Sequence, residues 1–126
     1  MLRYASTGLR SSNGLSKRES GEQTLKTITT SAARDLMATN DDFVLLDVRS
    51  LEEHREVRIA GAICIPHTEL EARAPVELAE KDQVIIVHCK GGSRSAEACG
   101  TLVKLGYTNI YDMGGIMSWP YETVSG

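Results

Sequence analysis

Three unbroken apolar runs of strand length place the strongest constraint on the fold of this chain. They lie at residues 43–46, 62–65 and 84–87, and stretches with helical spacing separate them. A strand with one wet face alternates apolar and polar residues, whereas a strand covered on both faces by helices is apolar throughout. The runs therefore predict an α/β fold, with a central, mostly parallel sheet and helices on both faces.

Caps and breaks predict the remaining elements. Thr30 or Ser31 can cap a helix that runs to Met37. Ser50 and Glu53 have the spacing of a capping box at the start of a second helix. Further elements are a strand at 27–29, helical turns at 68–73, a helix at 95–105, a strand at 109–111, a turn at 114–115 and a helical turn at 116–119, where Trp119 is expected to close over the core.

The chain is expected to consist of a tail at residues 1–24 and one domain at residues 25–126. Five basic and two acidic residues lie in 1–26, whereas nine basic and fifteen acidic residues follow. A basic, Ser-rich, acid-poor N-terminus is typical of a mitochondrial targeting peptide. The alternative is a disordered tail without an address, which would leave the protein cytoplasmic.

Composition also argues against several classes of protein. An acidic domain is a poor match for nucleic acid, which binds to clustered Lys and Arg. No apolar run approaches the ~20 residues that span a bilayer. Three cysteines in unrelated local sequences do not suggest a disulfide framework, and no His/Cys cluster has zinc spacing. We therefore expect no metal and no cofactor.

One segment combines the features of a reactive cysteine. Cys89 directly follows the run at 84–87, and ligands of parallel sheets bind beyond the carboxyl ends of the strands. A short loop follows, in which Gly91 and Gly92 permit backbone conformations that side chains would block. Converging loop amides and a helix N-terminus would stabilise a thiolate. We therefore expect the pKa of Cys89 to fall below the ~8.5 of a free cysteine.

The neighbouring residues have different expected roles. Lys90 and Arg94 place positive charge beside the loop and suggest an anionic substrate, although Arg94 could also be a solvated helix-end charge. Cys64 lies inside an apolar run and Cys99 on an inner helix face, so both are interpreted as core residues. His88 should point to the opposite face of the strand from Cys89 and is interpreted as a packed histidine.

The ordered motifs resemble the rhodanese superfamily over roughly residues 26–119. Cys89 to Arg94, followed by Ser95, looks like the six-residue active-site loop of sulfurtransferases. Arg58 stands where the family often has His. The other matching segments are Leu46-Asp47-Val48-Arg49 with Glu53, Arg58 to Ala62 with Ile65-Pro66, Leu105-Gly106-Tyr107, and Gly114-Gly115-Ile116 with Trp119. The resemblance implies the rhodanese-like three-layer fold.

The resemblance also implies a two-step sulfur transfer. The Cys89 thiolate would take the outer sulfur of a small anionic donor such as thiosulfate, and a thiol acceptor (glutathione or thioredoxin) or cyanide would then remove it. The substrate-binding residues would be those of the loop: Lys90, Gly91, Gly92, Ser93, Arg94 and Ser95. Asp47, Arg49 and Arg58 would support the site, and for Asp47 and Arg49 we favour a scaffolding role over direct approach to the sulfur.

Two other functions stay open at this point. Phosphatases and arsenate reductases of the superfamily resemble this chain but have one more residue between Cys and Arg, whereas four residues lie between Cys89 and Arg94 here. A non-catalytic binding module, or a persulfide relay for one protein partner, is the second alternative. The physiological donor, the acceptor and the oligomeric state carry no prediction.

Overall fold

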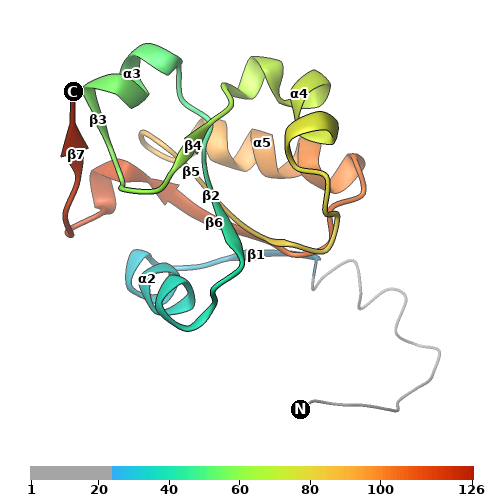
Figure 1. The fold of residues 1–126 in the computed structure, drawn as a ribbon, viewed down its shortest axis with the longest axis horizontal. Helices are drawn as coiled ribbons and strands as arrows, with labels where there is room; N and C mark the ends of the chain where they lie inside the picture. The colour runs from blue at the N-terminus through green and yellow to red at the C-terminus, as the bar shows by residue number, and fades with distance from the viewer. Residues whose placement is uncertain (1–23) are drawn as a thin grey trace.

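The computed structural model describes residues 24–126 (Figure 1). The expected tail and its targeting role therefore lie outside the described residues, apart from Thr24. The elements are β1 Leu25–Thr27, α2 Thr30–Thr39, β2 Phe43–Asp47, α3 Leu51–Glu56, β3 Val57–Arg58, β4 Ile63–Cys64, η1 His67–Glu69, α4 Leu70–Glu77, β5 Val84–Cys89, α5 Ser93–Lys104, β6 Ile110–Gly115, η2 Ile116–Ser118 and β7 Val124–Ser125.

A parallel sheet of five strands forms the centre of the domain, in the order β1-β6-β5-β2-β4. Figure 1 shows α2 on one side of this sheet and α4 and α5 on the other. The predicted α/β class, with a mostly parallel sheet covered on both faces, is confirmed. No helix within residues 24–126 is long and apolar enough to cross a membrane.

Strand β5 lies between two hydrophobic cores. Ile85, Val87 and Cys89 pack in the core on the side of α4 and α5. Ile86 packs in the core on the side of α2, and Leu36, Met37 and Trp119 pack against that core. Burial on both faces explains why this segment has no polar alternation, and it places Cys89 at the carboxyl end of a strand that is fixed from both sides.

The sequence prediction was wrong in three places. The run at 62–65 forms only the two-residue edge strand β4, and Ile63 is 40% exposed because the sheet ends there. The turn expected at 114–115 is the end of strand β6, which pairs with β5 as far as Gly115. Helix α4 reaches Glu77, beyond the expected 68–73, because Leu70 and Ala74 fill the core.

Smaller differences concern the ends of elements. Thr29 caps α2, since its hydroxyl oxygen accepts the Ala32 amide at 3.0 Å. Strand β1 lies two residues before the expected strand at 27–29. Strands β3 and β7 pair antiparallel and have no apolar run in the sequence that would reveal them. The capping box of α3 is present as predicted.

Candidate active site

Cys89 lies at the point where β5 gives way to the loop before α5. Its side chain is 1% exposed, and its sulfur accepts a hydrogen bond from the Gly92 amide at 2.9 Å. Gly92 has φ 116°, a left-handed conformation that a residue with a Cβ rarely adopts. The expected conformational need is thus confirmed for Gly92. The same expectation is wrong for Gly91, because its φ is not positive and an added Cβ would meet no atom within 4 Å.

The pKa of Cys89 is lowered from the ordinary value of a cysteine. Burial by itself would raise this pKa, because it disfavours the charged thiolate. The polar groups of Ser95, the Gly92 amide that donates to the sulfur at 2.9 Å, and the Arg94 amide together outweigh burial. The loop and the first turn of α5 therefore favour the thiolate form of Cys89, which is the direction that the sequence predicted.

Gly115 lies directly beneath the loop that follows Cys89. Cys89 pairs with Gly115 across β5 and β6, and the Met117 amide donates to the Lys90 carbonyl at 3.2 Å. A Cβ atom on Gly115 would lie 2.1 Å from the Lys90 carbonyl oxygen. Only glycine fits beneath the loop at this distance. The sequence predicted a turn at this residue, and no local pattern indicated its contact with the loop.

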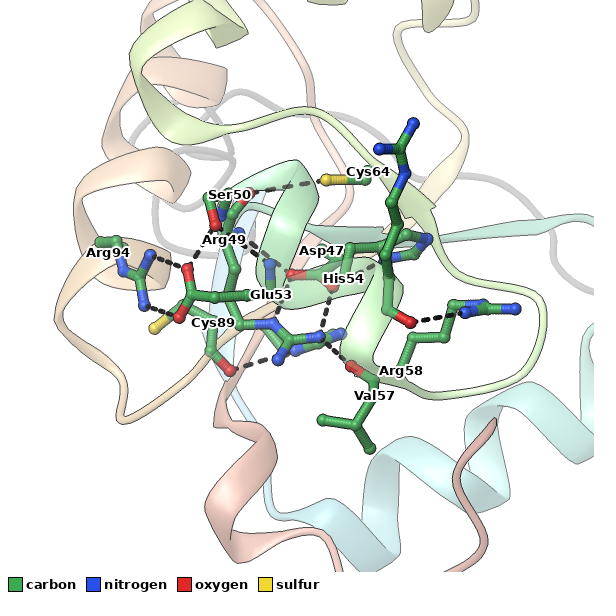
Figure 2. A network of polar contacts seen from close by, with 12 residues as sticks. Asp47, Arg49, Ser50, Glu53, His54, Val57, Arg58, Cys64, Cys89 and Arg94 are labelled. Atoms are coloured by element: carbon green, nitrogen blue, oxygen red, sulfur yellow. Dashed lines mark hydrogen bonds and ion pairs between the residues drawn. The ribbon is translucent and has the colours of Figure 1, made fainter. Parts of the chain in front are cut away.

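Arg94 is held by an ion pair across the mouth of the site. Its guanidinium donates to both oxygens of Glu53, at 2.7 and 3.0 Å, and each side chain is about 30% exposed. The hydrogen bonds from Arg94, together with those from Ser50, lower the pKa of Glu53 to about 2 although burial opposes the shift. Figure 2 shows Cys89 on the same side as this pair. An anionic donor that binds to Arg94, as the sequence predicts, would have to compete with the Glu53 carboxylate for the guanidinium.

A second polar cluster lies at the end of β2. Asp47 accepts hydrogen bonds from the Arg49 guanidinium at 2.9 and 2.7 Å and from His54 Nδ1 at 2.9 Å. Arg49 also donates to the Val57 carbonyl at 2.6 Å, which ties β2 to β3. Burial would raise the pKa of Asp47, but the hydrogen bonds from Arg49 and His54 are among the effects that hold it below its ordinary value.

His88 lies directly behind the nucleophile. It is fully buried, and its Nδ1 is 3.2 Å from the Cys89 carbonyl oxygen. Because a carbonyl only accepts, Nδ1 carries the proton. Nε2 has no hydrogen-bond partner within the described residues. Burial lowers the pKa of His88, so this ring is neutral at pH 7 and supports the backbone of Cys89 from the opposite face.

The remaining predicted site residues are not all brought together. Lys90 and Ser93 are exposed at the loop, and the Ser95 hydroxyl donates to the Gly92 carbonyl at 3.0 Å. Arg58 lies away from the loop, where it donates to the carbonyls of Arg55 and Gly126 (Figure 2). The roles expected for these residues remain predictions.

Among the residues that the structure describes, no amide donates to the sulfur of Cys64 or Cys99 as Gly92 does to that of Cys89. Burial raises the pKa of Cys64 to about 11, and its thiol is 3.5 Å from the Arg49 carbonyl. Burial also raises the pKa of Cys99, which is inaccessible in the core. Neither thiol is ionised near neutral pH. Within residues 24–126 no three His, Cys, Asp or Glu side chains are arranged to hold a metal ion.

A parallel α/β sheet with a cysteine loop at its carboxyl edge defines a protein with a nucleophilic-cysteine site. The chain belongs to the rhodanese-like domain family, whose sequence model matches residues 29–121. It is 31% identical to the thiosulfate sulfurtransferase PspE of Escherichia coli over 81 residues, which are 64% of this chain and 78% of PspE.

Other relatives agree with this assignment. A sulfurtransferase of Allochromatium vinosum is 30% identical over 86 residues, covering 66% of this chain and 77% of that protein. The structure of the human single-domain sulfurtransferase TSTD1 superposes with a TM-score of 0.67 at 29% identity, covering 74% of this chain and 93% of TSTD1. These similarities support an enzyme of the rhodanese superfamily, with sulfurtransferase activity and with sulfur donor and acceptor substrates in general.

Proposed function

We propose that this protein moves sulfane sulfur from thiosulfate, or a related small anionic donor, to a thiol acceptor through a persulfide on Cys89. The observation that carries the proposal is the sulfur of Cys89, which accepts the Gly92 amide at 2.9 Å and has a lowered pKa. A thiolate is the nucleophilic form of cysteine.

The first half of the reaction forms the persulfide. The Cys89 thiolate attacks the outer sulfur of thiosulfate, an S–S bond forms to Cys89, and the donor S–S bond breaks so that sulfite leaves with the electron pair. The Gly92 amide already donates to the cysteine sulfur, and the nearby amides of Arg94 and Ser95 also lower its pKa. Amides that converge on an anion stabilise it without reorganisation, which supports a similar role toward the terminal sulfur of the persulfide.

The second half regenerates the thiolate. An acceptor thiolate attacks the outer sulfur of the persulfide, and the bond to Cys89 Sγ breaks. Lys90 is the exposed cation of the loop and has no ion pair within residues 24–126, whereas Arg94 is paired with Glu53. We infer that Lys90 makes the first contact with an anionic donor, and that Arg94 contributes mainly by holding the loop to α3.

Intact mass measurement tests the proposal. The full chain is incubated with thiosulfate, freed of excess donor and weighed, and a gain of about 32 Da on Cys89 is expected for this covalent intermediate. Cys89→Ser should show no gain, and Cys64→Ser, which removes a thiol that is not activated, should gain as the wild type does. Absence of a gain with thiosulfate and with glutathione persulfide would overturn the proposal.

A further inference from the structure

A small hollow opens beside the catalytic loop. Its volume is about 240 Å³, and Lys90, the residue after Cys89, forms part of its wall. Glu56 and Val57, at the junction of α3 and β3, form another part, and the apolar side chains of Ile116 and Met117 contribute a third. Because the Met117 amide donates to the Lys90 carbonyl, the apolar part is fixed to the catalytic loop.

Considering only contacts among residues 24–126, the charges that line this hollow reduce to one free anion and one free cation. Arg49 and Glu53 also line it, but Arg49 is neutralised by Asp47 and Glu53 by Arg94. The side chains of Glu56 and Lys90 are exposed and have no hydrogen bond or ion pair within the described part of the chain. A ligand that carries an ammonium and a carboxylate would complement both.

We propose that the hollow is a subsite for an α-amino-acid thiol or its persulfide, with the carboxylate at Lys90, the ammonium at Glu56 and the sulfur directed to Cys89. This proposal rests on the proposed function and names the acceptor that it uses. The hollow is smaller than the about 300–1,000 Å³ of pockets that hold drug-sized ligands. A ligand of the size of cysteine fits this volume, and its methylene group can contact Ile116 and Met117.

The transfer at this subsite balances without any further reactant. The ligand thiolate forms a bond to the outer sulfur of the Cys89 persulfide, while the bond between that sulfur and Cys89 Sγ breaks. The electron pair returns to Sγ and restores the thiolate, and the ligand leaves as its persulfide. The reverse direction loads Cys89 from an amino-acid persulfide.

Three small thiols separate the two charge contacts. Cys89 is first loaded from thiosulfate, and its discharge is then timed with cysteine, with cysteamine, which has only the ammonium, and with 3-mercaptopropionate, which has only the carboxylate. Glu56→Gln should slow the discharge of the Cys89 persulfide by cysteine and by cysteamine about two- to fivefold, the effect of one exposed charge contact. The discharge by 3-mercaptopropionate should keep its rate. The ratio of variant to wild type for each thiol cancels its intrinsic reactivity.

Glu52→Gln is the matched control, because Glu52 is an exposed carboxylate of the same helix that does not line this hollow. Glu52→Gln should change the rate of discharge by the same factor for all three thiols. Equal slowing of the three thiols by Glu56→Gln, or no slowing of any, would overturn the subsite. Failure of thiosulfate to load Cys89 concerns the proposed function instead.

A binding measurement tests the subsite without any turnover. S-Methylcysteine, which keeps the amino and carboxylate groups but cannot accept sulfur, is titrated into Cys89→Ser and followed by backbone amide NMR. The expected shifts are saturable, lie at Glu56, Lys90 and Met117, and weaken about two- to fivefold in affinity when Glu56→Gln is added. Absence of saturable shifts at these residues would overturn the proposal.

Discussion

Replacement of Gly115 by alanine tests whether the catalytic loop rests on β6. Gly115 has φ −106° and ψ 148°, which alanine adopts readily, so the change introduces no backbone strain of its own. Its Cβ would lie 2.1 Å from the Lys90 carbonyl oxygen, 2.6 Å from the Lys90 carbonyl carbon and 2.7 Å from the Gly91 Cα. All three atoms belong to the backbone of the loop, and no side chain can rotate away to relieve the contact.

The size of the effect follows from these distances. Real Cβ atoms essentially never approach other atoms closer than 3.0 Å, so the backbone of Lys90, the residue after Cys89, must move by about 1 Å. A misplacement of that size in a reacting site costs roughly 10²-fold in rate. Overpacking of this kind also costs about 1–3 kcal/mol of the free energy of unfolding. We expect Gly115→Ala to slow persulfide formation about 100-fold and to lower the urea midpoint.

Single-turnover loading from thiosulfate and urea unfolding together measure the two effects. Gly100→Ala is the matched control, since Gly100 lies exposed in α5 with no atom within 4 Å of the added Cβ. That variant should load at the wild-type rate and gain about 0.5–1 kcal/mol of stability from better helix propensity. A Gly115→Ala protein with the wild-type rate and midpoint would refute the reasoning that the loop is seated on this residue.

Three further outcomes are expected. The thiolate absorbance of Cys89, taken as the difference from Cys89→Ser, should titrate below ~8.5 because the polar groups of the loop outweigh burial; a midpoint at or above that value would contradict the stabilisation of the thiolate by the loop. Glu53→Gln keeps the capping box but removes the ion pair to Arg94, and should cost about 0.5–1 kcal/mol of unfolding free energy at pH 7. The pKa of Glu53 falls from 4.5 to about 2 on folding, so its contribution to the free energy of unfolding is present above pH 4.5 and should disappear as the pH falls toward 2. If Glu53→Gln and wild type still differ in unfolding free energy at pH 2, the ion pair is not the source of the difference. Burial lowers the pKa of His88 in the folded protein, so the unfolded chain binds this proton more tightly, and the free energy of unfolding should fall below pH 6.5. This group contributes at most about 1.4 kcal/mol per pH unit to that fall. In His88→Phe this part of the pH dependence should be missing, and an unchanged pH dependence would show that His88 does not contribute to it.

The central strands and the cysteine loop could be predicted because their signals are local. Every residue of 43–46 and 84–87 is apolar, because both segments are strands whose two faces are covered. The glycines and the helix that follow Cys89 lie within a few residues of it. A short, contiguous pattern of this kind is readable from one sequence.

The contacts that complete the site could not be predicted, because they join residues that are distant in the chain. Glu53 has the spacing of a helix cap, and nothing in the sequence shows that the same carboxylate binds Arg94, 41 residues away. Beside Gly114, Gly115 has the pattern of a turn residue. It must be glycine because a Cβ atom there would collide with Lys90, 25 residues earlier in the chain. The Gly115 contact follows from the pairing of β5 with β6, and the Glu53–Arg94 pair follows from the approach of α3 to the start of α5. Neither is a local pattern in the sequence.

The distribution of charge explains how an acidic domain can hold a thiolate. Arg94 is the cation nearest in sequence to the end of the loop, but its bidentate pair with Glu53 leaves little net charge for the sulfur. The groups that lower the pKa of Cys89 are instead the amides of residues 92, 94 and 95 and the Ser95 hydroxyl. Fixed dipoles of this kind favour a single sulfur anion at one point and add no net positive charge. The Glu53–Arg94 pair joins the first turn of α5 to α3 and so contributes to the position of these dipoles. Because the dipoles depend on the backbone of the loop, we expect Gly115→Ala to affect the site more than Glu53→Gln does.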